Sequence, residues 1–338
     1  MSWRARAFAV VVALSTMLVA AYAWLTSGPP RSSDHRGMSG AAIPVEHLTE
    51  MPAAPFVLVR SLIADGTHGR LGVVPLSAPD GARFMAPLTC ERVFLAAGRG
   101  VCLTLGADGM RTTYTAEVFD ASYAVRGRVP LTGVPSRVRV SPDGRRAAVT
   151  VFEEGHSYAE HGFSTRTTMI DTRESETIAD LESFEVSREG QRFREVDFNF
   201  WGVTFAKDGN RFYATLASGG VKYLVEGDVD ARHARVVARH VECPSLSPDN
   251  TRIAYKRSYD DSRGIGWALH VLDLATGTDV ALDAERRSVD DQVEWLDDAH
   301  VMYHLPSSRG ADIWVIGVDG RTPPRILVPL AYSPAVVR

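Results

Sequence analysis

One short pattern, repeated along the chain, constrains the fold more than any other feature. It is clearest at residues 138–149, which read VRVSPDGRRAAV. Its valines alternate with polar residues, as expected for a half-buried strand. In the middle, Pro142 presets a turn, Asp143 can bond its own backbone and Gly144 accepts a positive φ. The stretch therefore predicts two antiparallel strands joined by a tight turn.

The same strand–turn–strand pattern recurs further along the chain. The turn aspartates of the four clear copies are Asp143, Asp208, Asp249 and Asp297. A degenerate copy at residues 92–131 has Ala97 in the place of the aspartate. The two later intervals match the roughly 40–50 residues of a four-stranded propeller blade. The first interval is longer, which indicates a blade with an insertion.

These five units leave strand segments at both ends of the chain. Residues 56–61 and 71–76 read as strands, and residues 332–337 read as an inner strand without partners. Together they can form a sixth blade, and closing the ring in this way removes exposed sheet edges. We therefore predict an all-β, six-bladed propeller of four-stranded antiparallel blades over residues 56–338. Five blades with additional irregular strands remain the alternative.

Three segments also resemble a known family. SPDGRR at 141–146, LSPDN at 246–250 and DIWVIGVDG at 312–320 are similar to repeats of the TolB-like, WD-related β-propeller proteins. The resemblance covers roughly residues 56–338 and implies the blade architecture. It implies little about function, because the motif specifies a turn. We expect no counterpart here of the additional N-terminal α/β domain of TolB itself.

The N-terminus carries an export segment. Two arginines precede an uncharged apolar run at residues 7–25, a pattern that directs export and leaves the N-terminus in the cytoplasm. The run is longer than a usual signal-peptide core, and Ala-Tyr-Ala at 21–23 offers a cleavage site. Residues 1–26 are therefore either a cleaved signal peptide or an uncleaved helical membrane anchor. Residues 27–55, rich in turn formers, are predicted to be a flexible linker.

The composition narrows the function. With 37 Lys and Arg against 41 Asp and Glu, the net charge is −4, which does not favour nucleic-acid binding. The sequence has no GxSxG, HExxH or phosphate-binding glycine loop. Its three cysteines, Cys90, Cys102 and Cys243, do not have zinc-site spacing. We therefore expect a protein that is not an enzyme and needs no cofactor.

A disulfide between Cys90 and Cys102 remains open at this stage. An oxidising compartment favours it. However, a turn at residues 96–99 pairs Val93 with Cys102 and leaves Cys90 three residues further on. At about 3.3 Å per residue, that is roughly 10 Å, whereas a disulfide needs Cα atoms within about 7 Å.

Candidate binding residues precede the predicted inner strands, where propellers usually bind ligands near the axis. They are Asp197, Asn199, Trp201, Glu242, Asp290, Asp291 and Gln292. Carboxylates that face one funnel can bind a divalent cation or a basic partner. The alternative is that they are solvated turn residues, and that Trp201 belongs to the core.

A second candidate is the insertion itself, which we place in the long loop at residues 153–166, after the inner hairpin of the second unit. Its His156, Tyr158 and His161 could contact a partner, since function is often carried by loops on rigid scaffolds. The histidine spacing fits neither strand nor helix, which disfavours a metal site. A plain exposed loop is the other interpretation. The mixed charges at residues 185–197 are typical of a solvated face.

These observations predict a monomeric, extracytoplasmic propeller that binds an envelope protein or peptide. It would be attached to the membrane by its N-terminal segment, or secreted after cleavage. The alternatives are a lactonase-like or lyase-like propeller enzyme with an axial metal, and a carbohydrate-sensing module.

Overall fold

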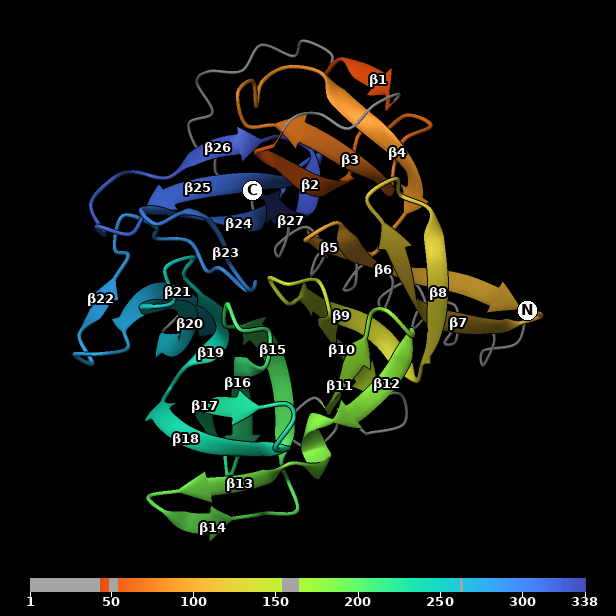
Figure 1. Ribbon diagram of the computed structural model, residues 1–338. Coiled ribbons are helices and arrows are strands. Elements are labelled where there is room, and N and C mark those ends of the chain that lie inside the picture. The colour runs from red at the N-terminus through yellow and green to blue at the C-terminus, as the bar shows by residue number, and fades with distance from the viewer. Residues whose placement is uncertain (1–42, 49–53, 154–163, 262–263) are drawn as a thin grey trace, which may run out of the picture. The chain divides into compact units, whose positions relative to one another are not determined.

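The computed structural model describes residues 43–48, 54–153, 164–261 and 264–338. These residues form six β-sheets, arranged as blades around a central axis (Figure 1). Among them the helical element is a single 3₁₀ turn, η1 (Leu181–Ser183). The predicted all-β, six-bladed propeller is therefore confirmed.

Four blades are four-stranded and antiparallel, as predicted. Blade 1 contains β5 (Arg92–Ala96), β6 (Arg99–Asp108), β7 (Arg111–Asp120) and β8 (Val125–Leu131). Blade 2 contains β9 (Gly133–Val140), β10 (Arg146–Glu153), β11 (Thr165–Asp171) and β12 (Glu176–Asp180). Blade 4 contains β19 (Glu242–Leu246), β20 (Arg252–Asp261), β21 (Gly264–Asp273) and β22 (Asp279–Ala281). Blade 5 contains β23 (Glu294–Asp297), β24 (His300–Ser307), β25 (Gly310–Gly317) and β26 (Arg325–Val328).

Blade 3 carries an inserted hairpin that contributes to the longer first repeat interval. The insertion predicted at residues 153–166 follows β10 in the sequence, and its residues 154–163 lie outside the described residues. The main strands of blade 3 are β15 (Asn199–Phe205), β16 (Arg211–Ser218), β17 (Val221–Asp228) and β18 (His233–Arg239). The inserted hairpin is β13 (Glu185–Arg188) and β14 (Gln191–Phe193), and β13 pairs in parallel with β18. The segment predicted to be only a solvated face therefore also extends the outer edge of this sheet.

Blade 6 is built from both ends of the described chain. It contains β27 (Ala331–Val337), β2 (Phe56–Ser61), β3 (Arg70–Pro75), β4 (Arg83–Thr89) and β1 (Val45–His47). The predicted pairing of the C-terminal strand with the first strands is confirmed, since Phe56 lies opposite Val337. Two elements differ from the prediction: β4 was not foreseen, and β1 lies inside the predicted linker and pairs in parallel with β4.

The innermost strands form a closed ring around the axis. In order these strands are β5, β9, β15, β19, β23 and β27, and β27 contacts β5 again. In Figure 1 the labels of these strands surround the centre, while β8, β12, β22 and β26 lie further out. The ring brings six segments that are far apart in sequence to one axis.

In two blades, a glycine on one strand lies opposite a buried phenylalanine on the neighbouring strand. Gly100 in β6 lies directly opposite Phe119, and a Cβ at residue 100 would lie 2.1 Å from the ring. In blade 3, Gly227 lies opposite Phe212 with the same 2.1 Å approach. The missing side chain makes room for a fully buried aromatic ring on the neighbouring strand.

The turn aspartate has the structural role that its recurrence suggested. The Asp143 carboxylate accepts hydrogen bonds from Ser141 Oγ at 2.6 Å and from the Arg145 amide at 3.1 Å. Gly144 has a φ of 72°, as the turn requires. Asp249 likewise accepts from Ser247 Oγ and from the Thr251 amide. The motif therefore stabilises turns and is not itself a site.

Cys90 and Cys102 form a disulfide, with Cα atoms 5.3 Å apart. Val93 does pair with Cys102, as the expected register requires. The estimate of roughly 10 Å assumed that the strand continues straight back to Cys90. It is wrong because β5 begins only at Arg92, and the chain bends between it and β4. The third cysteine, Cys243, is free and buried.

The predicted signal peptide or anchor at residues 1–26 lies outside the described residues, as does most of the predicted linker. In the part of the chain that the structure describes, no helix is long and apolar enough to cross a membrane.

Candidate functional site

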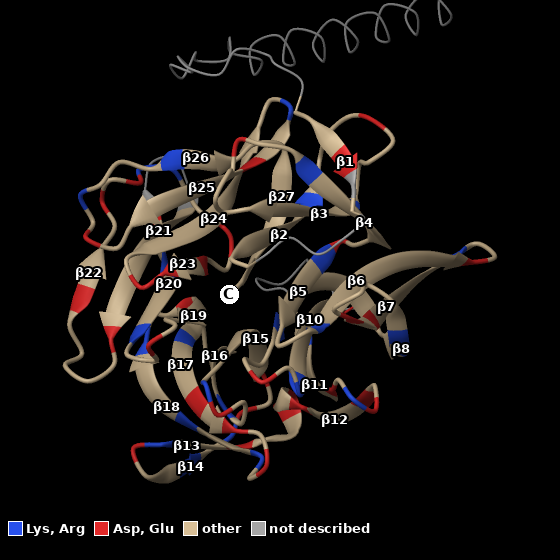
Figure 2. Ribbon diagram, turned by 45° about the horizontal axis from the view of Figure 1, so that its top comes forward, with Lys and Arg blue, Asp and Glu red and all other residues tan. Residues whose placement is uncertain are grey.

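The inner strands define two ends of the axis. We call the end where they begin the entry side, and the end where they finish the exit side. The axial candidates chosen from the sequence precede the inner strands or lie in their first residues, and therefore belong to the entry side. In Figure 2, acidic and basic residues are distributed over all the blades.

Three candidates from blade 3 make contacts that stabilise this blade or join it to blade 2. Asp197 accepts hydrogen bonds from Ser218 Oγ at 2.7 Å and from the Gly219 amide at 2.6 Å, and these bonds lower its pKa. Asn199 Oδ1 accepts from the Thr165 amide at 2.9 Å, which ties blade 3 to blade 2. Trp201 is buried, in line with the alternative that it belongs to the core.

Three further candidates lie in blade 4 or in the segment that leads into blade 5. Asp290 forms an ion pair with Lys256, and Glu242 lies opposite Lys256 in the β19–β20 register. Gln292 donates from Nε2 to the carbonyls of Val203 at 3.0 Å and Pro244 at 2.7 Å. This side chain therefore connects β15 and β19 to the segment that leads into β23.

Asp291 occupies a different environment, at the centre of a buried cluster on the entry side. Its Oδ2 lies 2.5 Å from His304 Nδ1. Its Oδ1 lies 3.7 Å from Arg92 and 3.9 Å from Arg137. Burial alone would raise the pKa of this carboxyl, but His304 and the two arginines outweigh it and hold the pKa far below its usual range.

His156, Tyr158 and His161 lie outside the described residues. Among the described residues, no group of three or more His, Cys, Asp or Glu side chains is arranged to hold a metal ion.

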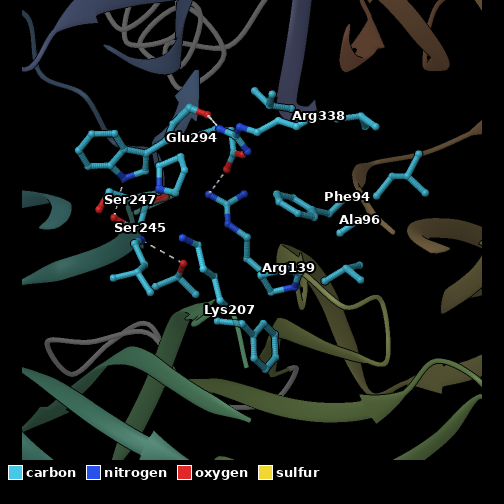
Figure 3. A pocket seen from close by; sticks show the side chains of 18 of the residues that line it. Phe94, Ala96, Arg139, Lys207, Ser245, Ser247, Glu294 and Arg338 are labelled. Atoms are coloured by element: carbon cyan, nitrogen blue, oxygen red, sulfur yellow. Dashed lines mark hydrogen bonds and ion pairs between the residues drawn. The ribbon is translucent and has the colours of Figure 1, made fainter. Parts of the chain in front are cut away.

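The exit side carries a cavity that the sequence did not predict. It has a volume of about 280 Å³ and is lined by residues near the ends of all six inner strands. Figure 3 shows Arg139 reaching into this space from below, with Glu294 and Arg338 on the opposite side and Phe94 beside it. We call this cavity the exit funnel.

An ion pair crosses the exit funnel. Arg139 Nη2 lies 3.2 Å from Glu294 and donates to the Val293 carbonyl at 2.7 Å. The Arg139 guanidinium also stacks over the Phe94 ring, 4.8 Å from its centroid. Burial raises the pKa of Glu294, and the positive charges of Arg139 and Arg338 oppose that rise. The pair therefore links β9 in blade 2 with β23 in blade 5.

The funnel wall combines apolar and cationic groups. Trp295 is buried and its Nε1 donates to the Ser245 carbonyl at 2.8 Å. Arg338 donates to the Trp295 carbonyl. Lys207 also lines the funnel and is exposed. With Arg139 matched by Glu294, Lys207 and Arg338 leave the funnel with an excess of positive charge.

The prediction concentrated on the residues just before each inner strand. It missed the funnel residues because they lie further along the same strands or, like Glu294, at the first residue of a short strand. A signal was nevertheless present. Arg139 and Glu294 interrupt strands whose other residues are mainly apolar, and charged residues buried in strands usually have partners. Their pairing could not be foreseen, because more than 150 residues separate them in the chain.

Comparisons with known proteins identify the fold. No family model matches the sequence, and no curated protein matches it in a sequence comparison. Among solved structures, TolB from Acinetobacter baumannii is similar with a TM-score of 0.54 and 16% identity, over 84% of this chain and 66% of that one. The chain thus spans slightly less than two thirds of that TolB.

Hydrazine synthase from Kuenenia stuttgartiensis is similar with a TM-score of 0.50 and 14% identity, over 84% of this chain and 80% of that one. At these identities the similarity shows the fold alone. It supports a TolB-like β-propeller and leaves the activity to be argued from the site.

Proposed function

We propose that this propeller is a non-enzymatic, extracytoplasmic scaffold that binds an acidic segment of an envelope protein or peptide in the exit funnel. The observation that carries the proposal is the funnel itself. All six inner strands contribute to one cavity with apolar walls and unmatched positive charge. At about 280 Å³ it is close to the lower end of the range for ligand pockets, which suits a few side chains of a peptide.

The extracytoplasmic location is supported by two independent features. The apolar run at residues 7–25 predicts export. The Cys90–Cys102 disulfide is of a kind that persists in oxidising compartments and is rare in the cytosol.

Site-specific crosslinking tests the proposal. A photo-reactive residue at position 207, in the full chain in its native envelope, should give one defined crosslinked product. A peptide from the captured protein should then bind the purified propeller. Lys207→Glu should weaken this binding at least about tenfold, because the substitution reverses a charge at the funnel.

Lys222→Glu is the matched control, since Lys222 lies on β17 and does not line the funnel. It should bind as the wild type does. Equal crosslinking from positions 207 and 222, or binding that is insensitive to Lys207→Glu, would refute the funnel as the binding site.

A further inference from the structure

The entry side of the axis has a second cavity, which shares Arg139 with the exit funnel. Two arginine side chains, Arg92 at the start of β5 and Arg137 in β9, lie side by side near the axis. Their side chains are only 12% and 15% exposed. Two guanidinium groups buried together need counter-charge, because desolvating a charge is costly unless it is paired.

The available counter-charge is insufficient. Within the described residues, Asp291 is the carboxylate that forms ion pairs with both arginines, at 3.7 and 3.9 Å. These distances are too long for hydrogen bonds. The other Asp291 oxygen is bonded to His304. The two arginines thus share one carboxylate, which His304 also contacts, and the cluster has an excess of positive charge.

The neighbouring ion pairs do not correct this imbalance. Lys256 is paired with Asp290 and lies opposite Glu242, and Arg139 is paired with Glu294. None of these carboxylates forms an ion pair with Arg92 or Arg137 within the described residues.

Burial alone would lower the pKa of Arg137, but the acidic groups around it, Cys243 and Asp291 among them, outweigh its burial and raise its pKa. Burial lowers the pKa of Arg92, and the like charge of Arg137 lowers it further. The two guanidinium groups therefore repel each other, and a bound anion would relieve that repulsion.

The hydrogen-bond donors of the two arginines are also poorly used. Arg137 Nη1 donates to the Ser136 carbonyl at 3.0 Å, but its Nε is buried without a partner. Within the described residues the Arg92 guanidinium makes no hydrogen bond, and it stacks on the Tyr332 ring 4.2 Å from the centroid. Buried donors without partners are rare in proteins and call for an explanation.

A small cavity lies at this point. Its volume is about 20 Å³, and its lining includes Arg92, Arg137, Asp291 and Ser333. A cavity of this size holds about one atom of oxygen size. It can therefore receive one oxygen of a carboxylate, while the rest of the ligand stays towards the mouth of the axis.

We propose that Arg92 and Arg137 form a binding site for a carboxylate on the entry side of the axis. The excess of positive charge favours an anion, the guanidinium geometry suits a carboxylate, and the cavity limits what enters to one oxygen. The ligand is either a free small carboxylic acid or the carboxylate of a peptide. The site stands whether or not the exit funnel binds a protein.

Thermal unfolding of the full chain tests the site, with sodium acetate titrated against sodium chloride at constant ionic strength. Acetate should raise Tm by about 2–4 °C at roughly ten times its dissociation constant. Arg92→Met should abolish this rise. The variant should still fold, because one arginine then matches one aspartate. Arg92→Lys keeps the positive charge but not the planar guanidinium that can form two parallel hydrogen bonds with a carboxylate. This variant should therefore show a smaller rise of Tm with acetate than the wild type.

Arg126→Gln is the matched control. It removes an arginine from a surface ion pair with Asp120, where the Arg126 side chain is 58% exposed. Its response to acetate should equal that of the wild type. Two results would overturn the proposal: an acetate response no larger than that of chloride, or a full acetate response in a folded Arg92→Met protein.

The source of the carboxylate is distinguished by isothermal titration calorimetry. The probes are acetate, and a short acetylated tripeptide with either a free or an amidated C-terminus. A free-acid peptide that binds at least about tenfold more tightly than acetate, with no binding of the amide, identifies a peptide carboxylate. Equal affinities of acetate and the free-acid peptide identify a small acid. Binding of the amidated peptide equal to that of the free acid contradicts a carboxylate site.

Discussion

At the scale of single residues, the same residue type has opposite roles in this protein. Asp143 and Asp249 are bound by hydroxyl and amide donors of their own turns, so their charge is used locally. Asp291 is bound by side chains from other strands and helps to compensate buried arginines. The sequence distinguishes the two kinds of aspartate in one way: the turn aspartates belong to a motif that is repeated along the chain, whereas Asp291 does not.

Glu182 is a half-buried carboxyl whose raised pKa reduces stability at neutral and alkaline pH. Burial raises its pKa from 4.5 to about 7, although the Thr167 amide donates to it. Above pH 7 the folded protein must hold this group charged, which costs stability. As pH falls through about 7 towards the unfolded value, the folded state takes up the proton first and stability rises.

Glu182→Gln should therefore stabilise the protein at pH 8 by roughly 1–3 kcal/mol and have little effect near pH 4.5. Urea unfolding at both pH values measures this difference. Glu189→Gln is the control, since the Glu189 side chain is 81% exposed. An equal effect of Glu182→Gln at the two pH values would show that the Glu182 carboxyl does not titrate in this window.

At the scale of structural elements, blade 6 depends on contacts between the two ends of the described chain. Arg83 in β4 is fully buried. It donates to Ser61 Oγ at 3.2 Å and to the carbonyls of Leu330 at 2.9 Å and Pro329 at 2.6 Å. One side chain thus ties the strands that begin the propeller to the turn that leads into its last strand.

Arg83→Met should destabilise the protein by about 2–4 kcal/mol, because it leaves buried carbonyls without donors. Guanidinium chloride unfolding gives the free energy directly. Arg70→Met is a useful comparison, because in the described part of the chain the Arg70 side chain donates to the Ala86 carbonyl alone and is partly exposed. It should cost clearly less, and equal losses would contradict a special role for Arg83.

The disulfide joins the end of β4 to β6 and so connects blade 6 with blade 1. It links residues that are 12 apart in sequence. A disulfide across a loop of this length restricts the unfolded chain and should raise the free energy of unfolding by about 3 kcal/mol. The Cys90→Ser, Cys102→Ser double variant should lose stability of that order in chemical denaturation. Cys243→Ser tests whether the effect is specific, and a double variant as stable as the wild type would refute the bridge.

At the scale of the whole molecule, closure is the decisive feature. The ring is completed by β27, which pairs with β2 and contacts β5. Without β27, β2 would present an unpaired edge, and the cavity at each end of the axis would lose one wall.

Truncation after Pro329 should therefore abolish cooperative unfolding and produce a protein that aggregates or binds a hydrophobic dye. Scanning calorimetry and dye fluorescence measure both effects. Removal of residues 1–42, before the first described strand, is the matched control and should leave the transition intact. A truncated protein that unfolds cooperatively at the wild-type temperature would show that closure is dispensable.

The sequence by itself determined the local architecture. Each turn, such as Pro142–Asp143–Gly144, requires only neighbouring residues, so its chemistry is readable wherever it occurs. The recurrence of that turn and the alternation of apolar residues were sufficient for the blades, their order and the closing strand. They were not sufficient for β1 or β4, since short strands at the edge of a sheet depend on the partner that they find.

Tertiary structure alone decided the sites and the disulfide. The bend before Arg92 brings Cys90 to Cys102, and no local motif in the sequence marks it. Arg139 meets Glu294, and Arg92 meets Arg137 and Asp291, only after the ring of inner strands has closed. The physical reason is that a turn is stabilised by its own residues, whereas a site on the axis consists of groups from several blades that approach one another only in the completed propeller.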